Sequence, residues 1–166
     1  SRGYSTRNSI SVDEIGELVK IVREIDKNTI IMVDNCYGEF VETKEPCDVG
    51  VDLMAGSLIK NAGGGIAPTG GYIVGRQDVI EQVSSRFIAP SIGLDVGSYA
   101  GSYTPFFQGC FAAPHVTLNA LKGSILFGRV AEKLGFSSFP VFGEMPHDIV
   151  RTFELGDADK LIEFCR

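Results

Sequence analysis

The chain has 166 residues, and its 15 basic and 21 acidic side chains give a formal net charge of −6 at pH 7. Hydrophobic residues make up 44% and charged residues 22%, which is typical of a globular domain and excludes a disordered chain. The acidic charge argues against nucleic acid or an anionic membrane as partner, because both favour a basic surface. The apolar runs, such as 30–33, are too short to span a bilayer, and no secretory signal is visible. The length predicts one domain with its own core.

Cysteine and histidine spacing gives no sign of a disulfide scaffold or a metal centre. The four cysteines are far apart and form no C-x-x-C pair, so we expect reduced thiols in a cytoplasmic protein. The two histidines, His115 and His147, lie near no other ligand in the sequence. No metal site is therefore predicted.

The first predicted element is a helix over residues 12–25. Ser11 and Glu14 form a capping box, and Ile10 and Ile15 are placed to form a hydrophobic staple. Apolar residues then follow at helical spacing, with charges on the other face.

Three strands are predicted next, followed by a short amphipathic helix over 79–87. The continuous apolar run 29–33 favours a central parallel strand that is covered on both faces. The second and third strands are expected at 53–57 and 72–74.

The second half of the chain is predicted to be mainly helical. Residues 90–109 read as a long loop, after which Pro114 is placed to open a long helix that Gly135 closes. Weak strand signals follow at 136–142 and 148–150, and Asp157 is a candidate cap for a helix over 158–164. The order of elements indicates an α/β fold.

Two of the predicted strands are followed by ionisable side chains, Asp34 and Lys60. In open α/β sheets, ligands bind at the carboxyl ends of strands. The carboxylate and the amine could form a structural ion pair, a general acid–base pair, or two anchors of one cofactor. The residue types alone leave these alternatives open, and the ion pair is favoured because buried charges are usually paired.

Two short motifs near Lys60 are less informative. Ser57 and Lys60 fit an S-x-x-K pattern, but the companion K-T-G motif of penicillin-recognising enzymes is missing. The glycine-rich run 63–71 is neither a P-loop nor a dinucleotide fingerprint. It indicates either a flexible turn or backbone that passes close to a flat ligand, which glycine permits.

Long blocks around these residues resemble one bacterial family, the pyridoxal-phosphate (PLP) dependent carbon–sulfur lyase-like proteins. Members are named methionine γ-lyase family, cystathionine β-lyase family or aluminium resistance proteins. The blocks that carry the resemblance are 34–42, 45–46, 52–61 and 63–73, with shorter ones at Arg2–Ser5, 107–109 and 113–115.

The resemblance implies the aspartate-aminotransferase-like (fold type I) architecture, with a mainly parallel sheet flanked by helices. Residues 1–110 would then belong to the large PLP-binding domain, and 111–166 to a connecting helix and the start of a small C-terminal domain. Because members of the family are much longer, the chain is expected to be part of a longer protein.

The resemblance also assigns four site residues. Lys60 matches the catalytic lysine that binds PLP covalently, and Asp34 matches the carboxylate that pairs with the pyridine nitrogen. Ser57 matches a hydroxyl that contacts the phosphate, and Cys36 would lie near the ring. A lysine in this role needs a neutral amine, so we expect its pKa to be lowered by desolvation or a nearby positive charge.

The function implied is carbon–sulfur lyase activity on sulfur-containing amino acids, by removal of the α-proton and β- or γ-elimination. The alternatives are another PLP enzyme of this fold (an aminotransferase, a decarboxylase or an aldolase) or a catalytically incompetent fragment, because the fold does not fix the reaction. The family further implies a homo-oligomer, either a dimer or a tetramer, that binds an amino-acid substrate and neither nucleic acid nor membrane.

Overall fold

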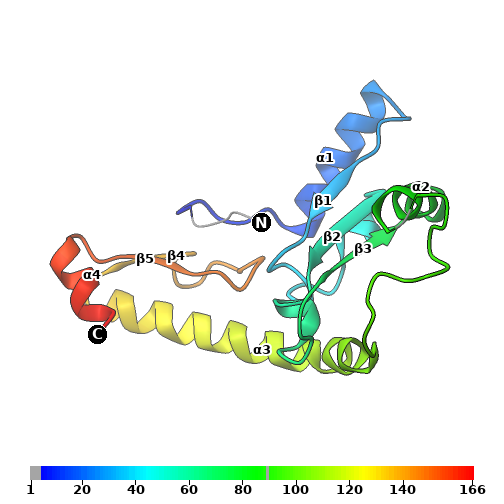
Figure 1. Ribbon diagram of the computed structural model, residues 1–166. Helices are drawn as coiled ribbons and strands as arrows, with labels where there is room; N and C mark the ends of the chain where they lie inside the picture. The colour runs from blue at the N-terminus through cyan, green and yellow to red at the C-terminus, as the bar shows by residue number, and fades with distance from the viewer. Residues whose placement is uncertain (1–4, 89) are drawn as a thin grey trace.

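A computed structural model describes residues 5–88 and 90–166. Residues 2–4 of the short resemblance block Arg2–Ser5 therefore lie outside the described part. Within that part, the chain is a mixed α/β structure with a three-stranded sheet, a two-stranded sheet and four α-helices. The two sheets lie at opposite ends of the long helix α3 (Thr104–Lys133), which runs along one side of the molecule (Figure 1).

Helix α1 (Val12–Ile25) confirms the predicted capping box. The Glu14 amide donates to the Ser11 hydroxyl at 3.1 Å, and the Ser11 amide donates to the Glu14 carboxylate at 2.8 Å. Two helix donors that have no partner within the helix are thereby satisfied. The helix packs through Gly16 against Val49 of the short 3-10 helix η1 (Pro46–Val49).

The larger sheet has the order β1 (Met32–Asp34), β2 (Leu53–Ser57), β3 (Gly71–Gly75). Strands β1 and β2 are parallel, whereas β2 and β3 are antiparallel, so the described sheet is mixed and not mainly parallel. The run 29–33 was expected to form a central strand; β1 starts only at Met32, and in the described residues it pairs with β2 alone. The central position in a longer protein stays a prediction. Apolar sequence indicates a strand that can be buried, but strand pairing decides its position.

Asp52, at the start of β2, ties the strands together at the end of the sheet that is remote from Asp34. Its buried carboxylate accepts from Arg23 at 2.5 Å and from Arg76 at 2.7 Å, and also from the Ile31 amide at 2.8 Å. Burial raises the pKa of Asp52, but the hydrogen bond from Ile31 and the two guanidinium groups outweigh it, so the pKa lies below its usual range.

The sheet is followed by α2 (Gln77–Phe87) and then by α3, which begins ten residues earlier than the sequence predicted. Pro105 occupies the first-turn position that was predicted for Pro114, and Pro114 lies inside the helix. The expectation at Pro114 was wrong because a first-turn proline and an interior proline look alike in sequence. The expected division of domains at residue 110 falls within α3 and stays a prediction.

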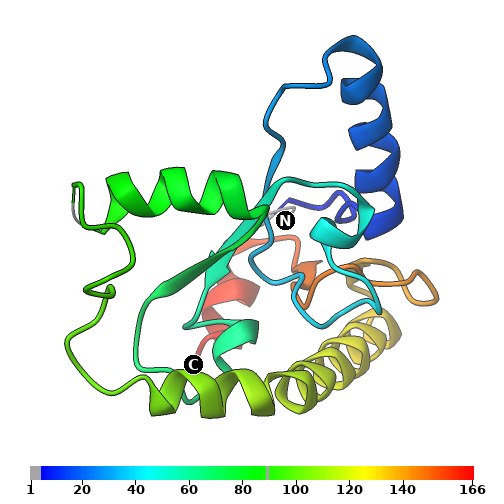
Figure 2. The same cartoon turned by 90° about the vertical axis from the view of Figure 1, so that its right-hand side faces the viewer.

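The C-terminal part is an antiparallel pair, β4 (Ser137–Phe139) and β5 (Thr152–Glu154), followed by α4 (Ala158–Phe164). The strand expected at 148–150 is wrong in position, because β5 begins at Thr152. The predicted cap of α4 is confirmed, since Asp157 accepts from the Lys160 amide at 2.9 Å. In Figure 2 this unit (orange to red) lies behind the larger sheet, on the same side of α3 as helix α2.

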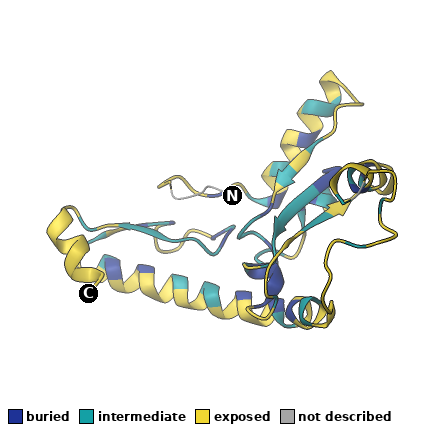
Figure 3. Cartoon of the chain, in the orientation of Figure 1, coloured by how far each residue is buried: buried dark blue, intermediate teal, exposed yellow. Residues whose placement is uncertain are grey.

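Buried residues gather at 51–53, at the start of β2, and where the short 3-10 helix η2 (Asn61–Gly63) meets α3, whereas most of the larger sheet is half-buried or exposed (Figure 3). Much of α3 is exposed, including Phe107 at 74% and Phe111 at 91%. Among the described residues, the largest fully buried side chains are Thr117, Asp148, Pro46 and Ser138, and not a leucine or an aromatic residue. The helices in the described residues are too short or too polar to cross a membrane.

Candidate functional site

The two ionisable residues singled out in the sequence follow neighbouring parallel strands. Asp34 ends β1 and pairs in register with Ala55 of β2, while Ser57 ends β2 and Lys60 follows three residues later. Because the two strands run in the same direction, the turns that follow them leave the sheet at the same edge.

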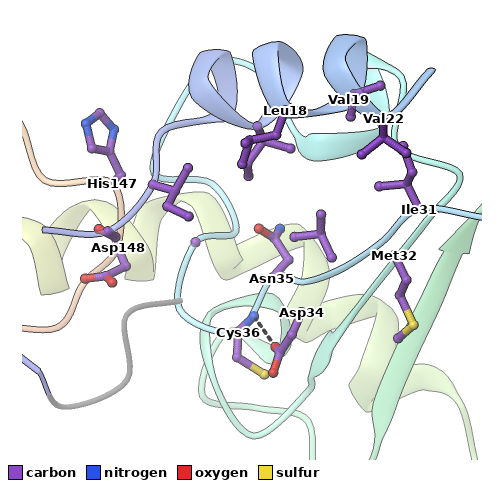
Figure 4. A pocket seen from close by; sticks show the side chains of 15 residues that line it. Leu18, Val19, Val22, Ile31, Met32, Asp34, Asn35, Cys36, His147 and Asp148 are labelled. Atoms are coloured by element: carbon purple, nitrogen blue, oxygen red, sulfur yellow. Dashed lines mark hydrogen bonds between the residues drawn. The ribbon is translucent and has the colours of Figure 1, made fainter. Parts of the chain in front are cut away.

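The Asp34 carboxylate is held by the turn that it opens. Its Oδ1 accepts from the Cys36 amide at 3.0 Å, shown as the dashed line in Figure 4, where the Cys36 thiol lies beside the carboxylate. The hydrogen bond from the Cys36 amide, and after it the one from the Cys36 thiol, hold the pKa of Asp34 below its usual range. Asp34 is therefore an anion at neutral pH, as its predicted role requires.

The Lys60 amine lies against the turn that follows Asp34. Its Nζ is 4.2 Å from the centroid of the Tyr37 ring, within the range of a cation–π contact. Desolvation lowers the pKa of Lys60, but the contacts with Cys36 and Tyr37 outweigh it and the pKa is raised. This direction is opposite to the one expected from the sequence, because the groups that surround the amine favour its charged form.

Ser57 and Cys36 also lie at this edge. The Ser57 hydroxyl accepts from the Ile59 amide at 3.4 Å, and the Ser57 carbonyl accepts from the Lys60 amide at 3.2 Å, so Ser57 shapes the turn before the lysine. Burial raises the pKa of the Cys36 thiol, and the neighbouring Asp34 raises it further. Cys36 is thus a neutral thiol beside the two charged groups. The roles of these residues toward a cofactor stay predictions.

The sequence reasoning missed Asn61. This side chain is 5% exposed, and its Nδ2 donates to the carbonyls of Tyr37 and Glu39, both at 3.0 Å. It therefore joins the turn that carries Lys60 to the turn that follows Asp34. A polar residue directly after a candidate catalytic lysine is the signal that could have pointed to it.

Glu39 forms a second buried contact at the same edge. It is 3% exposed, and its Oε1 accepts from the Tyr72 hydroxyl at 2.8 Å, while Oε2 is buried without a hydrogen-bond partner among the described residues. Burial raises the pKa of Glu39. Only glycine fits at position 56 between them, because a Cβ there would lie 2.3 Å from Oε1 of Glu39.

The glycine-rich run after Lys60 has a packing role that neither sequence interpretation included. A Cβ on Gly64 would lie 2.2 Å from the Gly109 carbonyl oxygen, and a Cβ on Gly109 would lie 2.2 Å from that of Gly63. The backbone of η2 therefore touches the backbone of α3 directly. This contact fixes the position of the turn that carries Lys60, and it explains why two separate resemblance blocks both contain glycine.

A cavity of about 370 Å³ lies between α1 and β1 (Figure 4). Its walls are mainly aliphatic, with Leu18 and Val22 on one side and Ile31 on the other, and Asp34 and Cys36 lie at its edge. His147 and Asp148 of the C-terminal part also line it, but Lys60 and Ser57 do not. The structure thus brings Asp34 and Cys36 to a cavity that the lysine does not line.

The groups gathered at the sheet edge suit one kind of ligand. An amine can bond to an aldehyde, an anionic carboxylate can pair with a protonated ring nitrogen, and a hydroxyl can donate to a phosphate. Lys60, Asp34 and Ser57 supply these three groups, so the residues present fit PLP. In the described residues, no cluster of three or more His, Cys, Asp or Glu side chains is placed to hold a metal ion.

Comparison with known proteins gives a consistent match. Residues 1–166 match the methionine gamma-lyase family. The chain is 49% identical over its whole length to the protein YnbB of Bacillus subtilis, of which it covers 39%, and 44% identical to a 33.9 kDa protein of Lactobacillus delbrueckii subsp. bulgaricus, of which it covers 54%. It also resembles the crystal structure of a carbon–sulfur lyase involved in aluminium resistance from Clostridium novyi NT, with 50% sequence identity and a TM-score of 0.93. The match covers 97% of this chain and 38% of that lyase. The chain thus spans about half or less of the length of these relatives.

Proposed function

This chain belongs to the methionine gamma-lyase family, and we propose on that premise that it carries the PLP-binding lysine of a carbon–sulfur lyase. The substrates proposed are sulfur-containing amino acids. The reaction is β- or γ-elimination, which releases a thiol, ammonia and a 2-oxo acid. Since the chain covers only part of its relatives, the activity is proposed for a longer protein that includes it.

One observation carries this proposal. The lysine and the aspartate that match the family follow two adjacent parallel strands, and the Lys60 amine lies over the Tyr37 ring, three residues after Asp34. A simple ion pair is not needed to explain the two residues, because each has its own hydrogen-bonding or ring partner.

Each residue has a distinct task in the proposed reaction. Asp34, held anionic by its turn, would bind and orient the protonated pyridine nitrogen. The Ser57 hydroxyl would donate to the phosphate, and the Lys60 amine would hold the aldehyde carbon covalently. When bound, PLP supplies an electron sink for the α-carbon of the substrate. The Lys60 amine would be the general base that removes the α-proton of the substrate.

The raised pKa of Lys60 sets a condition on this scheme. The amine must lose its proton before it can bond to an aldehyde, so cofactor attachment is expected to accelerate as the pH rises. The neutral Cys36 thiol beside the amine is a candidate to contact the ring.

The test is borohydride trapping of PLP on the protein, followed by peptide mass spectrometry. Lys60→Ala is expected to abolish the trapped adduct at this site, whereas Lys122→Ala, which removes an exposed lysine of α3, leaves it unchanged. An equal yield of adduct in Lys60→Ala would refute the assignment.

The reaction type is tested in a full-length protein that includes this chain. Release of thiol, ammonia and a 2-oxo acid from a cysteine or homocysteine thioether supports the lyase. Formation of a 2-oxo acid only when an amino acceptor is present would instead identify an aminotransferase. The proposed homo-oligomer is tested on the same protein by sedimentation, where a monomer would contradict it.

A further inference from the structure

We propose that Asn61 is a positioning residue of this site, whose amide joins the turn after Asp34 to the turn that carries Lys60 and, through Tyr37, sets where the Lys60 amine lies. This inference rests on the proposed function only for the role of Lys60. The placement itself follows from the contacts described below.

The first step is the geometry of the Asn61 amide. A single nitrogen, Nδ2, donates both of its N–H groups, one to the Tyr37 carbonyl and one to the Glu39 carbonyl, each at 3.0 Å. Both carbonyls belong to the turn that begins at Asp34. Because Asn61 is only 5% exposed, water does not readily replace these bonds.

The second step is the shape of the turn that accepts them. Tyr37 has a φ of +73° and Phe40 a φ of +62°, a backbone conformation that residues other than glycine rarely adopt. Such backbone persists where the surroundings hold it in place. The amide of Asn61 supplies two of the contacts that hold it, and the Ile149 amide supplies another to the Tyr37 carbonyl at 3.2 Å.

The third step is that these contacts close a cycle that starts and ends at Lys60. Lys60 is bonded to Asn61, the Asn61 side chain holds the Tyr37 carbonyl, and the Tyr37 ring lies 4.2 Å from the Lys60 Nζ. Main-chain hydrogen bonds fix the backbone of Lys60, because the Lys60 amide donates to the Ser57 carbonyl and the Gly63 amide donates to the Lys60 carbonyl. If the Asn61 amide is removed, the Tyr37 carbonyl keeps only the bond from the Ile149 amide, and the Tyr37 ring is less constrained over the amine.

The test uses the cofactor-free chain and the reactivity of Lys60 itself. Trace labelling with acetic anhydride over a pH series, read by peptide mass spectrometry, reports the neutral fraction of each lysine, with Lys122 as internal reference. The groups that face the Lys60 amine are Tyr37, Cys36 and Asp34. Asn61→Ala is expected to lower the pH midpoint of Lys60 labelling and to raise labelling about threefold at a fixed pH below that midpoint, as expected when a cation–π contact is lost.

A second variant keeps the proposal falsifiable if Asn61→Ala folds poorly. Tyr37→Leu removes the ring and leaves both carbonyls in place, so it is expected to give the same shift of the midpoint. The double variant is expected to add no further shift, because both changes break one cycle of contacts. Additive shifts would overturn the proposal.

The matched control is Ser138→Ala, which removes a buried hydroxyl of β4 that accepts from Arg151 at 2.9 Å, away from Lys60. It is expected to lower stability without moving the midpoint of Lys60 labelling. An Asn61→Ala variant that behaves in the same way, with lower stability and an unchanged midpoint, would show that Asn61 only supports the fold and would overturn the proposal. Failure of PLP trapping on Lys60 would refute the proposed function without changing this result.

Discussion

Two regions of the molecule are held together by different means. The strand-tip region, made of residues 35–42, the turn 58–64 and the part of α3 around Gly109, is held by buried hydrogen bonds and by direct contact of backbones. The C-terminal unit, made of β4, β5, α4 and the end of α3, is held by a cluster of rings and by the hydrogen bonds that Arg151 donates to the Ser124 and Ser138 hydroxyls. The rings are those of Phe127, Phe153 and Phe164, with centroids 5.4 to 6.2 Å apart.

The difference concerns how much displacement each region tolerates. Hydrogen bonds and backbone contacts fail when atoms move by a fraction of an ångström, because their energies depend steeply on geometry. Ring contacts allow many similar arrangements, and Phe127 and Phe164 are more than half exposed. The region that carries the candidate site, where two backbones touch directly, is therefore expected to tolerate less displacement than the ring cluster, as suits a place where reactive groups must be positioned.

The largest expected effect comes from adding one methyl group to the backbone contact. Gly109→Ala places a Cβ 2.2 Å from the Gly63 carbonyl oxygen, so the turn that carries Lys60 must move away from α3. We expect a loss of about 3 kcal/mol or more in the free energy of unfolding, measured with a denaturant.

The matched control lies on the same helix. A Cβ on Gly123 meets no atom within 4 Å, so Gly123→Ala is expected to stabilise the protein by about 0.5–1 kcal/mol. If both substitutions gave the same change, the close backbone contact would have no energetic importance.

Removal of the Tyr72 hydroxyl tests its buried hydrogen bond with Glu39 in the strand-tip region. Tyr72→Phe leaves the Glu39 carboxyl without its donor at 2.8 Å, and we expect it to lower the free energy of unfolding by about 2 kcal/mol. As a control, Tyr103→Phe removes an exposed hydroxyl that accepts from the Ser98 and Tyr99 amides, and it should cost less because water can replace these bonds. Equal losses would indicate that burial of the pair does not matter.

The pH dependence of stability is a second test of the buried Glu39 carboxyl in the strand-tip region. Because burial raises the pKa of Glu39, the native state keeps this proton at pH values where the unfolded chain has lost it. The contribution of Glu39 to stability is therefore present at low pH and is lost as the pH rises above the ordinary glutamate value. Relative to Glu39→Gln, which cannot titrate, the wild type should lose unfolding free energy as the pH rises above about 4. A constant difference between the two proteins would contradict this.

A smaller effect is expected in the C-terminal unit. Phe153→Leu keeps an apolar side chain between Phe127 and Phe164, whose partial exposure leaves room to adjust, so we expect a loss of about 1 kcal/mol in thermal or denaturant unfolding. The pH midpoint of Lys60 labelling should not change. A loss as large as that of Gly109→Ala would remove the distinction between the two regions.

The features predicted correctly from the sequence are those that depend on neighbouring residues. The capping box of α1, the cap at Asp157 and the positions of β2 and β3 were all evident, because caps and strand patterns are local. The errors at Pro114 and at the strand near 148–150 arose where the neighbouring residues are compatible with more than one position of the element.

The sequence by itself determined the family, the capped helices and the pair Asp34 and Lys60 at two strand ends. Only the tertiary structure decided that the sheet is mixed, that the glycines after Lys60 contact α3, and that Asn61 joins the two turns. The physical reason is distance along the chain. Contacts between neighbouring residues follow from the residue types, whereas the Tyr37, Asn61 and Gly109 contacts form only after loops of many residues have closed.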